Sequence, residues 1–285
     1  MKPVNELSTT NVEIVQQNSP HKKNNQNQIA TVRPIHYLGS KLRIIDSIIE
    51  AIDRIDPSKG AVCDLFAGSG TVSKSLSLKR SVTSVDIQEY SRVLCSGLLN
   101  PVSGRPTDAH EFVLHCEKSK FYSMLTWCAE TLIDYETECM NKALAGNPGP
   151  LCELVENSSL IIFEKKQSMN LSSGLIGALQ TTLKRLEKSH LLSGPEALTT
   201  RYFGGTYFSF LQAVQLDTIL YEISLLNERS KDTYRAAALS AASDLVNTVG
   251  KQFAQPLKTT NPDGTPKNNI VNRIRTDRKQ KCFSL

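Results

Sequence analysis

The stretch AVCDLFAGSG at residues 61–70 is an apolar run that leads directly into a glycine-rich turn. The apolar residues 61–66 predict a short buried strand, and the turn predicts the start of a helix over 71–78. The segment SVTSVD at 81–86 predicts another strand, which ends in Asp86. A strand, a turn, a helix and a strand in this order predict a parallel sheet and a Rossmann-like core of the α/β class.

The rest of the chain divides by composition on either side of this unit. Helical spacing of apolar residues predicts helices over 42–52 and 87–99, and a long, mainly helical region follows them. The N-terminal residues are polar and rich in asparagine and glutamine, so they have little apolar surface to bury. We therefore expect four regions: a disordered arm at 1–32, an α/β core at 33–106, a large helical insertion at 107–250 and a basic tail at 251–285.

The composition is that of an ordinary globular protein, since 40% of the 285 residues are hydrophobic. No run approaches the roughly 18 uninterrupted apolar residues of a membrane-spanning helix, so we expect no membrane partner. The first residues lack an apolar core with a cleavage site, which argues against a secretory signal. The seven cysteines form no Cys-x-x-Cys pair and predict reduced thiols in a cytoplasmic protein.

The formal net charge of +5 is concentrated toward the C-terminal end. Residues 251–285 contain eight lysines and arginines against two aspartates, whereas the chain before them is close to neutral. A basic segment of this kind can contact nucleic-acid phosphates. A solvated, disordered end is the alternative interpretation, and composition alone does not decide between the two.

The glycine turn and Asp86 together favour a nucleoside ligand. A glycine-rich turn between a strand and a helix lets the backbone pass close to a ligand and directs helix amides at it. Ser73 stands where a dinucleotide-binding fingerprint has its third glycine, and no Gly-Lys-Ser/Thr follows as in a P-loop. Asp86 lies 22 residues after Asp64, where a carboxylate can accept hydrogen bonds from both hydroxyls of a ribose.

Three segments of the chain resemble one enzyme family. DLFAGSG at residues 64–70 resembles motif I of the S-adenosylmethionine-dependent DNA methyltransferases, and HYLGSK at 36–41 resembles motif X of the Dam-like adenine-N6 enzymes. In those enzymes an aromatic-x-Gly-Gly-Lys segment precedes motif I. Tyr37 stands here at the aromatic position and Lys41 at the lysine, while Ser40 replaces the second glycine. Asp86 falls at the acid of motif II.

The resemblance implies a Rossmann-like methyltransferase core with S-adenosylmethionine as the cofactor, bound by the region 33–106. Lys41 would pair with the methionine carboxylate and Asp86 would accept from the ribose hydroxyls. Packing alternatives stay open for Tyr37 and Phe66, and a solvated cation is the alternative for Lys41. The residues that would line the cofactor are Tyr37, Lys41, Asp64, Phe66, Gly68, Gly70 and Asp86.

One motif of this family is missing from the sequence, because none of its 12 prolines is adjacent to another. In those enzymes an Asp/Asn/Ser-Pro-Pro-Tyr/Phe/Trp segment receives an adenine flipped out of the duplex and accepts hydrogen bonds from its amine. We therefore assign no catalytic residue and expect an incomplete sheet. Three explanations stay open: a truncated enzyme, one subunit of a split enzyme, or a chain that keeps cofactor binding for a non-catalytic task.

Double-stranded DNA is the partner that the resemblance implies, with a second subunit carrying the missing motif as a further one. The region 107–250 would then recognise the target sequence. For the aromatic segment 202–210, core packing is an equally compatible interpretation. The residues we nominate for phosphate contact or base stacking are Arg201, Tyr202, Tyr207, Arg273 and Arg275.

The sequence supports other classes of function less well. The histidines show no metal-ligand spacing, so we expect no metal site. A catalytically silent subunit that binds cofactor or DNA competes with the enzyme hypothesis. A methyltransferase acting on RNA or a small molecule is a third hypothesis, and the placement of motif X ahead of motif I argues against it.

Overall fold

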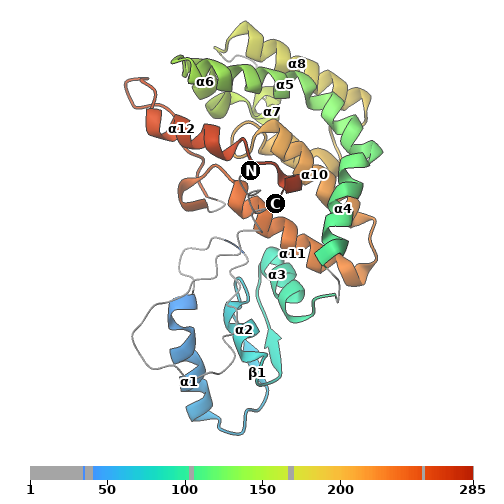
Figure 1. Cartoon of the computed structure of the whole chain (residues 1–285), viewed down its shortest axis with the longest axis vertical. Coiled ribbons are helices and arrows are strands. Elements are labelled where there is room, and N and C mark those ends of the chain that lie inside the picture. The colour runs from blue at the N-terminus through green and yellow to red at the C-terminus, as the bar shows by residue number, and fades with distance from the viewer. Residues whose placement is uncertain (1–34, 36–40, 103–105, 166–169, 252–253, 285) are drawn as a thin grey trace, which may run out of the picture.

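Figure 1 shows the fold as a computed structural model, which describes residues 35, 41–102, 106–165, 170–251 and 254–284. The predicted arm at 1–32 and the site residue Tyr37 lie outside the described residues. Residues 41–102 form a small unit that we call the sheet part, and residues 106–284 form a larger unit that we call the helical part. Figure 1 shows the sheet part at the bottom and the helical part above it.

The sheet part contains the predicted strand–turn–helix–strand unit. Two short parallel strands pair with Val62 opposite Val82 and Asp64 opposite Ser84, and a helix connects them. The prediction of a parallel sheet is therefore confirmed, although both strands are shorter than the segments 61–66 and 81–86 that predicted them. The elements are the 3-10 turn η1 (Lys41–Ile44), α1 (Ile45–Ile55), β1 (Val62–Asp64), α2 (Thr71–Leu76), β2 (Val82–Ser84) and α3 (Glu89–Leu99).

The strands of the sheet part are poorly covered. Cys63 and Thr83, in the middle of β1 and β2, are exposed, and the residues on either side of them are only half-buried. Leu65 and Phe66 have left the strand, which explains why β1 ends earlier than the apolar run. Burial in this unit is concentrated between the helices, where Leu94 of α3 is fully buried.

The helical part carries most of the apolar core. The long helix α5 packs against α8 and α10, and the fully buried side chains of Leu132, Leu179 and Phe210 form the centre of this cluster. Its elements are α4 (Pro106–Lys118), α5 (Lys120–Leu144), α6 (Gly149–Asn157), α7 (Leu160–Lys165), α8 (Ser173–Lys188), η2 (Pro195–Ala197), α9 (Leu198–Tyr202), α10 (Phe210–Ser224), α11 (Glu228–Leu245), η3 (Val249–Lys251), α12 (Asn268–Asp277) and η4 (Cys282–Ser284). The described residues are thus mostly helical, with a two-stranded parallel sheet.

Local sequence explains where the central helix α10 begins. The side chain of Ser209 accepts a hydrogen bond from the backbone amide of Gln212, and the Gln212 side chain accepts one from the Ser209 amide. This reciprocal pair satisfies two amides that a helix start leaves without partners. Glu136 of α5 accepts a further bond from the Phe210 amide, at 2.7 Å, so α5 and α10 are joined at the helix start.

The C-terminal residues are packed, and the solvated end that composition allowed is wrong for residues 268–284. Val271 and Ile274 of α12 are buried against α5 and α6. Arg278, directly after α12, is fully buried and forms an ion pair with Glu136 at 2.5 Å. Its Nε also donates to the side chain of Asn247 at 3.1 Å. The basic segment is therefore part of the helical core, and one of its positive charges lies inside it.

The two parts meet where α3 packs along α11. Gly97 of α3 lies against Ala236, so closely that a Cβ on Gly97 would stand 2.7 Å from the Ala236 side chain. Beside this contact, Arg92 of α3 forms an ion pair with Asp232 of α11 at 2.7 Å. The close approach at Gly97 and the ion pair fix how the sheet part sits on the helical part.

Candidate cofactor site

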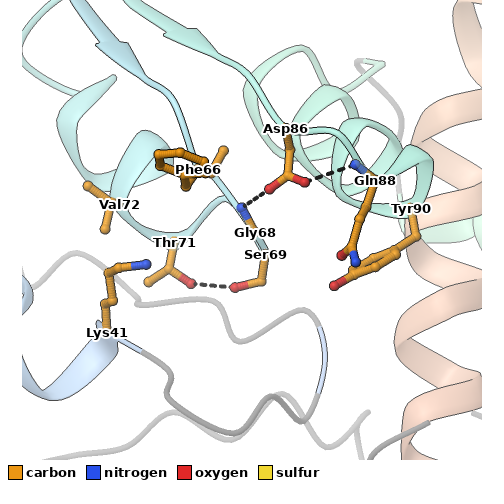
Figure 2. Close-up of a pocket in the computed structure, with 10 residues that line it drawn as sticks. Lys41, Phe66, Gly68, Ser69, Thr71, Val72, Asp86, Gln88 and Tyr90 are labelled. Carbon is orange, nitrogen blue, oxygen red and sulfur yellow. Dashed lines mark hydrogen bonds between the residues drawn. The ribbon is translucent and has the colours of Figure 1, made fainter.

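A pocket of about 300 Å³ lies at the glycine turn of the sheet part. Figure 2 shows that it is formed by the turn itself, the first residue of η1, the start of α2, and the segment that joins β2 to α3. These segments come from the three places in the sequence that carry the motif resemblance. The lining residues are Lys41, Phe66, Ala67, Gly68, Ser69, Thr71, Val72, Asp86, Gln88 and Tyr90.

Asp86 is held in place by the backbone on both sides of the pocket. One carboxylate oxygen accepts from the amide of Gln88 and the other from the amide of Gly68, each at 2.9 Å. These two hydrogen bonds, from Gln88 and then Gly68, lower the pKa of Asp86. The side chain is therefore a carboxylate at neutral pH. Each of its oxygens keeps a second lone pair, so the group can still accept hydrogen bonds from a ligand.

The two glycines of the turn have backbone conformations that favour glycine. Gly68 has φ of 54° and Gly70 has φ of 75°, both in the left-handed region. At Gly70 a side chain would also meet Cys95 Sγ at 3.1 Å and Leu98 Cδ1 at 3.2 Å. The turn needs these conformations to bring the Gly68 amide to Asp86, so the glycines of the turn help to fix the position of the Asp86 carboxylate.

Asp64 and Gly70 support the pocket from behind, since neither is among its lining residues. Asp64 accepts a hydrogen bond from the hydroxyl of Ser73 at 2.7 Å, which ties the end of β1 to α2. Gly70 is buried under α3, where it gives α2 its first turn. The sequence predicted both as wall or floor of the pocket, and the structure places them one layer below it.

Phe66 and Lys41 lie in the lining, as the resemblance implies. The Phe66 side chain is 83% exposed, so its ring has an open face beside the pocket. Figure 2 shows Lys41 across the pocket from Asp86. An aromatic ring, a cation and a carboxylate therefore surround one cavity. Tyr37, the remaining predicted member, lies outside the described residues.

Six lining residues were missed by the sequence prediction. Ala67 and Ser69 lie inside the segment that resembles motif I, whereas Thr71, Val72, Gln88 and Tyr90 lie outside the motifs. The hydroxyls of Ser69 and Thr71 lie 3.1 Å apart and join the turn to the start of α2. Gln88 and Tyr90 belong to the segment that follows β2. Their distance from Asp86 in the sequence, two and four residues, is the signal that could have found them.

The residues nominated for DNA lie away from this pocket, since none is among its lining residues. Arg201 has a side chain only 10% exposed and forms an ion pair with Glu164 at 3.1 Å. Tyr202 is exposed, with the Arg201 guanidinium 5.8 Å from its ring centre, whereas Tyr207 is half-buried.

The other two nominees belong to α12. Arg273 donates to the carbonyl of Thr248 at 3.0 Å and lies 3.6 Å from Asp277. Arg275 is half-buried and donates to the side chain of its helix neighbour Asn272 at 3.2 Å. Neither α12 arginine is therefore without a contact inside the protein.

The described residues show neither a membrane-spanning helix nor a metal-binding cluster. Within them, no helix is both long and apolar enough to cross a membrane. The same residues contain no group of three or more histidine, cysteine, aspartate or glutamate side chains that could hold a metal ion.

Comparison with known proteins adds a similarity to one family over part of the chain. The model of the D12 class N6 adenine-specific DNA methyltransferases matches residues 37–139, which include the pocket, α3, α4 and most of α5. No curated protein and no solved structure matches the chain. Family members use S-adenosylmethionine and act on DNA. The match covers less than half of the chain, and over these residues the chain is similar to the D12 class N6 adenine-specific DNA methyltransferases.

Proposed function

We propose that the pocket at the glycine turn binds S-adenosylmethionine and that the chain acts in the methylation of adenine N6 in double-stranded DNA. The observation that carries this proposal is the arrangement around Asp86. Its carboxylate is fixed by the amides of Gly68 and Gln88 beside the open ring of Phe66. A fixed carboxylate next to an exposed ring is suited to a ribose and the adenine attached to it.

The residues present fit this cofactor by their chemistry. Asp86 would accept from the ribose hydroxyls with its free lone pairs. Phe66 would pack against the adenine, because an exposed aromatic ring gains from contact with a base. Lys41 would pair with the carboxylate of the methionine moiety. The pocket volume of about 300 Å³ is at the lower end of ligand sites, which suits a cavity that is open on one side.

In this proposal the chain binds the cofactor and positions its methyl group, and residues 1–285 do not supply the group that receives the target base. The bound cofactor would supply an electrophilic methyl group. Binding in a fixed place would hold that methyl group for in-line attack by the adenine amine, a step that depends on positioning. No two prolines are adjacent in these 285 residues, so the Pro-Pro segment that receives the adenine would come from outside them. The region 107–250 would contribute DNA recognition.

A cofactor titration tests the proposal directly. S-adenosylmethionine is titrated into the purified chain and into the variant Asp86→Ala. We expect the variant to lose affinity by about tenfold or more, because hydrogen bonds to a charged group contribute roughly 1.5–3 kcal/mol each. Asp46→Ala is the matched control, since Asp46 is an exposed carboxylate of α1 outside the pocket. Equal affinity of Asp86→Ala and the wild type would overturn the ribose role.

A methyl-transfer assay tests whether the chain needs the Pro-Pro segment from outside residues 1–285 to methylate DNA. The purified chain is incubated with labelled S-adenosylmethionine and adenine-containing duplex DNA. We expect no label in DNA from the chain alone, and label once a polypeptide carrying an Asp-Pro-Pro-Tyr segment of this family is added. Transfer by the chain alone would show that the Pro-Pro segment is not required.

The missing Pro-Pro segment also favours a second function, a catalytically silent subunit that binds cofactor or DNA for a partner enzyme. The same assay separates the two. A silent subunit would change the affinity of the partner for cofactor or DNA while a variant of the Asp86 site left the rate of transfer unchanged.

A further inference from the structure

A second and larger hollow lies in the helical part, far along the sequence from the cofactor pocket. It has a volume of about 570 Å³ and lies between the end of α6 and the segment 256–267, with Thr206 at one side. We call it the α6 groove. Its lining includes two lysines, Lys258 and Lys267, and one carboxylate, Glu156. No motif of the family falls on these residues.

The walls of the α6 groove are built and fixed. The segment 256–267 doubles back on itself, because Lys267 donates its amide to the carbonyl of Thr259 at 2.7 Å and Asn261 donates to Thr265 at 2.8 Å. Leu257 is buried in a cluster with residues of α5, α6 and α12. Lys258 and Lys267 therefore stand on the two arms of one hairpin. Lys267 pairs through its backbone with Thr259, the residue after Lys258.

The carboxylate in the groove, Glu156, is occupied by hydrogen bonds from within the protein. Glu156 accepts hydrogen bonds from the amide and the hydroxyl of Thr259, at 2.9 and 2.6 Å, and from the amide and the hydroxyl of Thr260, at 3.0 and 2.9 Å. Burial alone would raise the pKa of Glu156, but these hydrogen bonds outweigh it and lower the pKa. The carboxylate thus serves to hold the hairpin on α6, and its charge is balanced by four donors.

The positive charges of the groove have no such balance. Neither Lys258 nor Lys267 forms an ion pair or a side-chain hydrogen bond with any residue that the structure describes. The two aspartates of the C-terminal segment are engaged elsewhere. Asp263 accepts from Thr265 at the hairpin tip, and Asp277 pairs with Lys251 at 3.0 Å. The groove therefore presents two cations to solvent on a rigid frame.

We propose that the α6 groove binds the phosphate backbone of duplex DNA, with Lys258 and Lys267 as the contacting cations. This proposal rests on the proposed function, which makes DNA the substrate. Two lysines on adjacent hairpin arms suit consecutive phosphates of a strand better than a single small anion. Two further cations nearer the C-terminal end, Arg275 and Lys279, have no acidic partner among the described residues.

The test measures binding of the full chain to a labelled duplex of arbitrary sequence at several salt concentrations. We expect the double variant Lys258→Gln/Lys267→Gln to weaken binding to every sequence alike. We also expect the slope of log affinity against log salt to fall by about 1.8, because each phosphate contact contributes roughly 0.9 to that slope. The matched control is Lys118→Gln/Lys120→Gln, which removes two exposed lysines from the α4–α5 junction.

Each outcome decides the proposal. An unchanged slope in the groove variant, or an equal loss in the control, would overturn it. Competition by a polyglutamate peptide at the affinity of DNA would also overturn it, because the groove would then be a site for acidic protein segments. The S-adenosylmethionine titration is run on the same groove variant. Cofactor binding by the wild type and the groove variant alike, with an unchanged DNA slope, would refute the groove alone. No binding of S-adenosylmethionine by the wild-type chain, with the expected fall in the DNA slope, would refute the proposed function alone.

Discussion

The sheet part and the helical part differ in how completely they bury their apolar side chains. In the helical part, Leu132 and Leu179 are fully buried, and even charged groups such as Arg278 lie inside the core. In the sheet part, Ile87 is fully exposed and Leu65 is 60% exposed. Parallel sheets are normally covered on both faces. The helical part also exposes single apolar side chains such as Leu144 and Leu225, but it has a large buried core, whereas the sheet of residues 41–102 leaves much of its apolar surface uncovered.

The largest effect is expected at the charged centre of the helical part. Arg278→Ala removes the guanidinium that pairs with Glu136, and both side chains are almost fully buried. The uncompensated carboxylate should lower the free energy of unfolding by about 3–5 kcal/mol. Fluorescence of Trp127, the single tryptophan, reports unfolding of this part in urea. Adding Glu136→Gln to Arg278→Ala should recover part of the lost stability. If Arg278→Ala were as stable as the wild type, Arg278 would not anchor residues 268–284 to the helical core.

A pair of apolar substitutions tests the comparison itself. Leu132→Ala leaves a cavity in the helical core and should cost about 2–5 kcal/mol. Ile87→Ser, on the uncovered surface of the sheet part, should change the free energy of unfolding by no more than about 0.5 kcal/mol. Urea unfolding followed by circular dichroism measures both. A loss of several kcal/mol for Ile87→Ser would mean that Ile87 is covered in solution. The two parts would then not differ in how completely they bury their apolar side chains.

The contact between α3 and α11 leaves no room for an added side chain at Gly97. Gly97→Ala places a Cβ 2.7 Å from Ala236, so α3 must shift on α11, at a cost of about 1–3 kcal/mol for overpacking. Hydrogen exchange along α3 and α11 measures the loosening. Ala236→Gly removes the atom that is struck, and the double variant should regain most of the protection. Without that recovery, the Gly97 contact would not be what fixes the two parts together.

How far the sequence predicts each part depends on where the stabilising contacts lie along the chain. The strand–turn–helix–strand unit is predicted because the apolar residues 61–66 stand between Gly60 and the glycine turn that starts the following helix. The ends of the strands are misplaced, because Leu65 and Phe66 are apolar but stand at the pocket and on the surface. The helix α12 is missed because it is mostly polar, and its neighbour Arg278 finds its partner Glu136 far away in the sequence.

The candidate site shows the same limit. Lys41, Phe66, Gly68 and Asp86 carry motifs, and the structure brings them to one pocket. Gln88 and Tyr90 line the same pocket but carry no motif, because only the path of the chain after β2 turns them toward it. The supporting role of Asp64 depends on Ser73, and no spacing rule of the motif specifies that hydrogen bond.

The smallest effect separates backbone conformation from packing, using one glycine from each part. Gly68 in the pocket turn and Gly177 in α8 both have open space where a Cβ would stand, but only Gly68 has positive φ. Gly177→Ala should therefore raise the free energy of unfolding by about 0.4–1 kcal/mol, because alanine restricts the unfolded chain. Gly68→Ala should lower the stability of the turn by about 1–2 kcal/mol, the cost of a left-handed conformation with a side chain. Hydrogen exchange measures both, at the amides of 66–74 for the turn and of 173–188 for α8. If both alanines stabilised, the left-handed turn would not be the conformation in solution, and the Gly68 amide would then be free to leave Asp86.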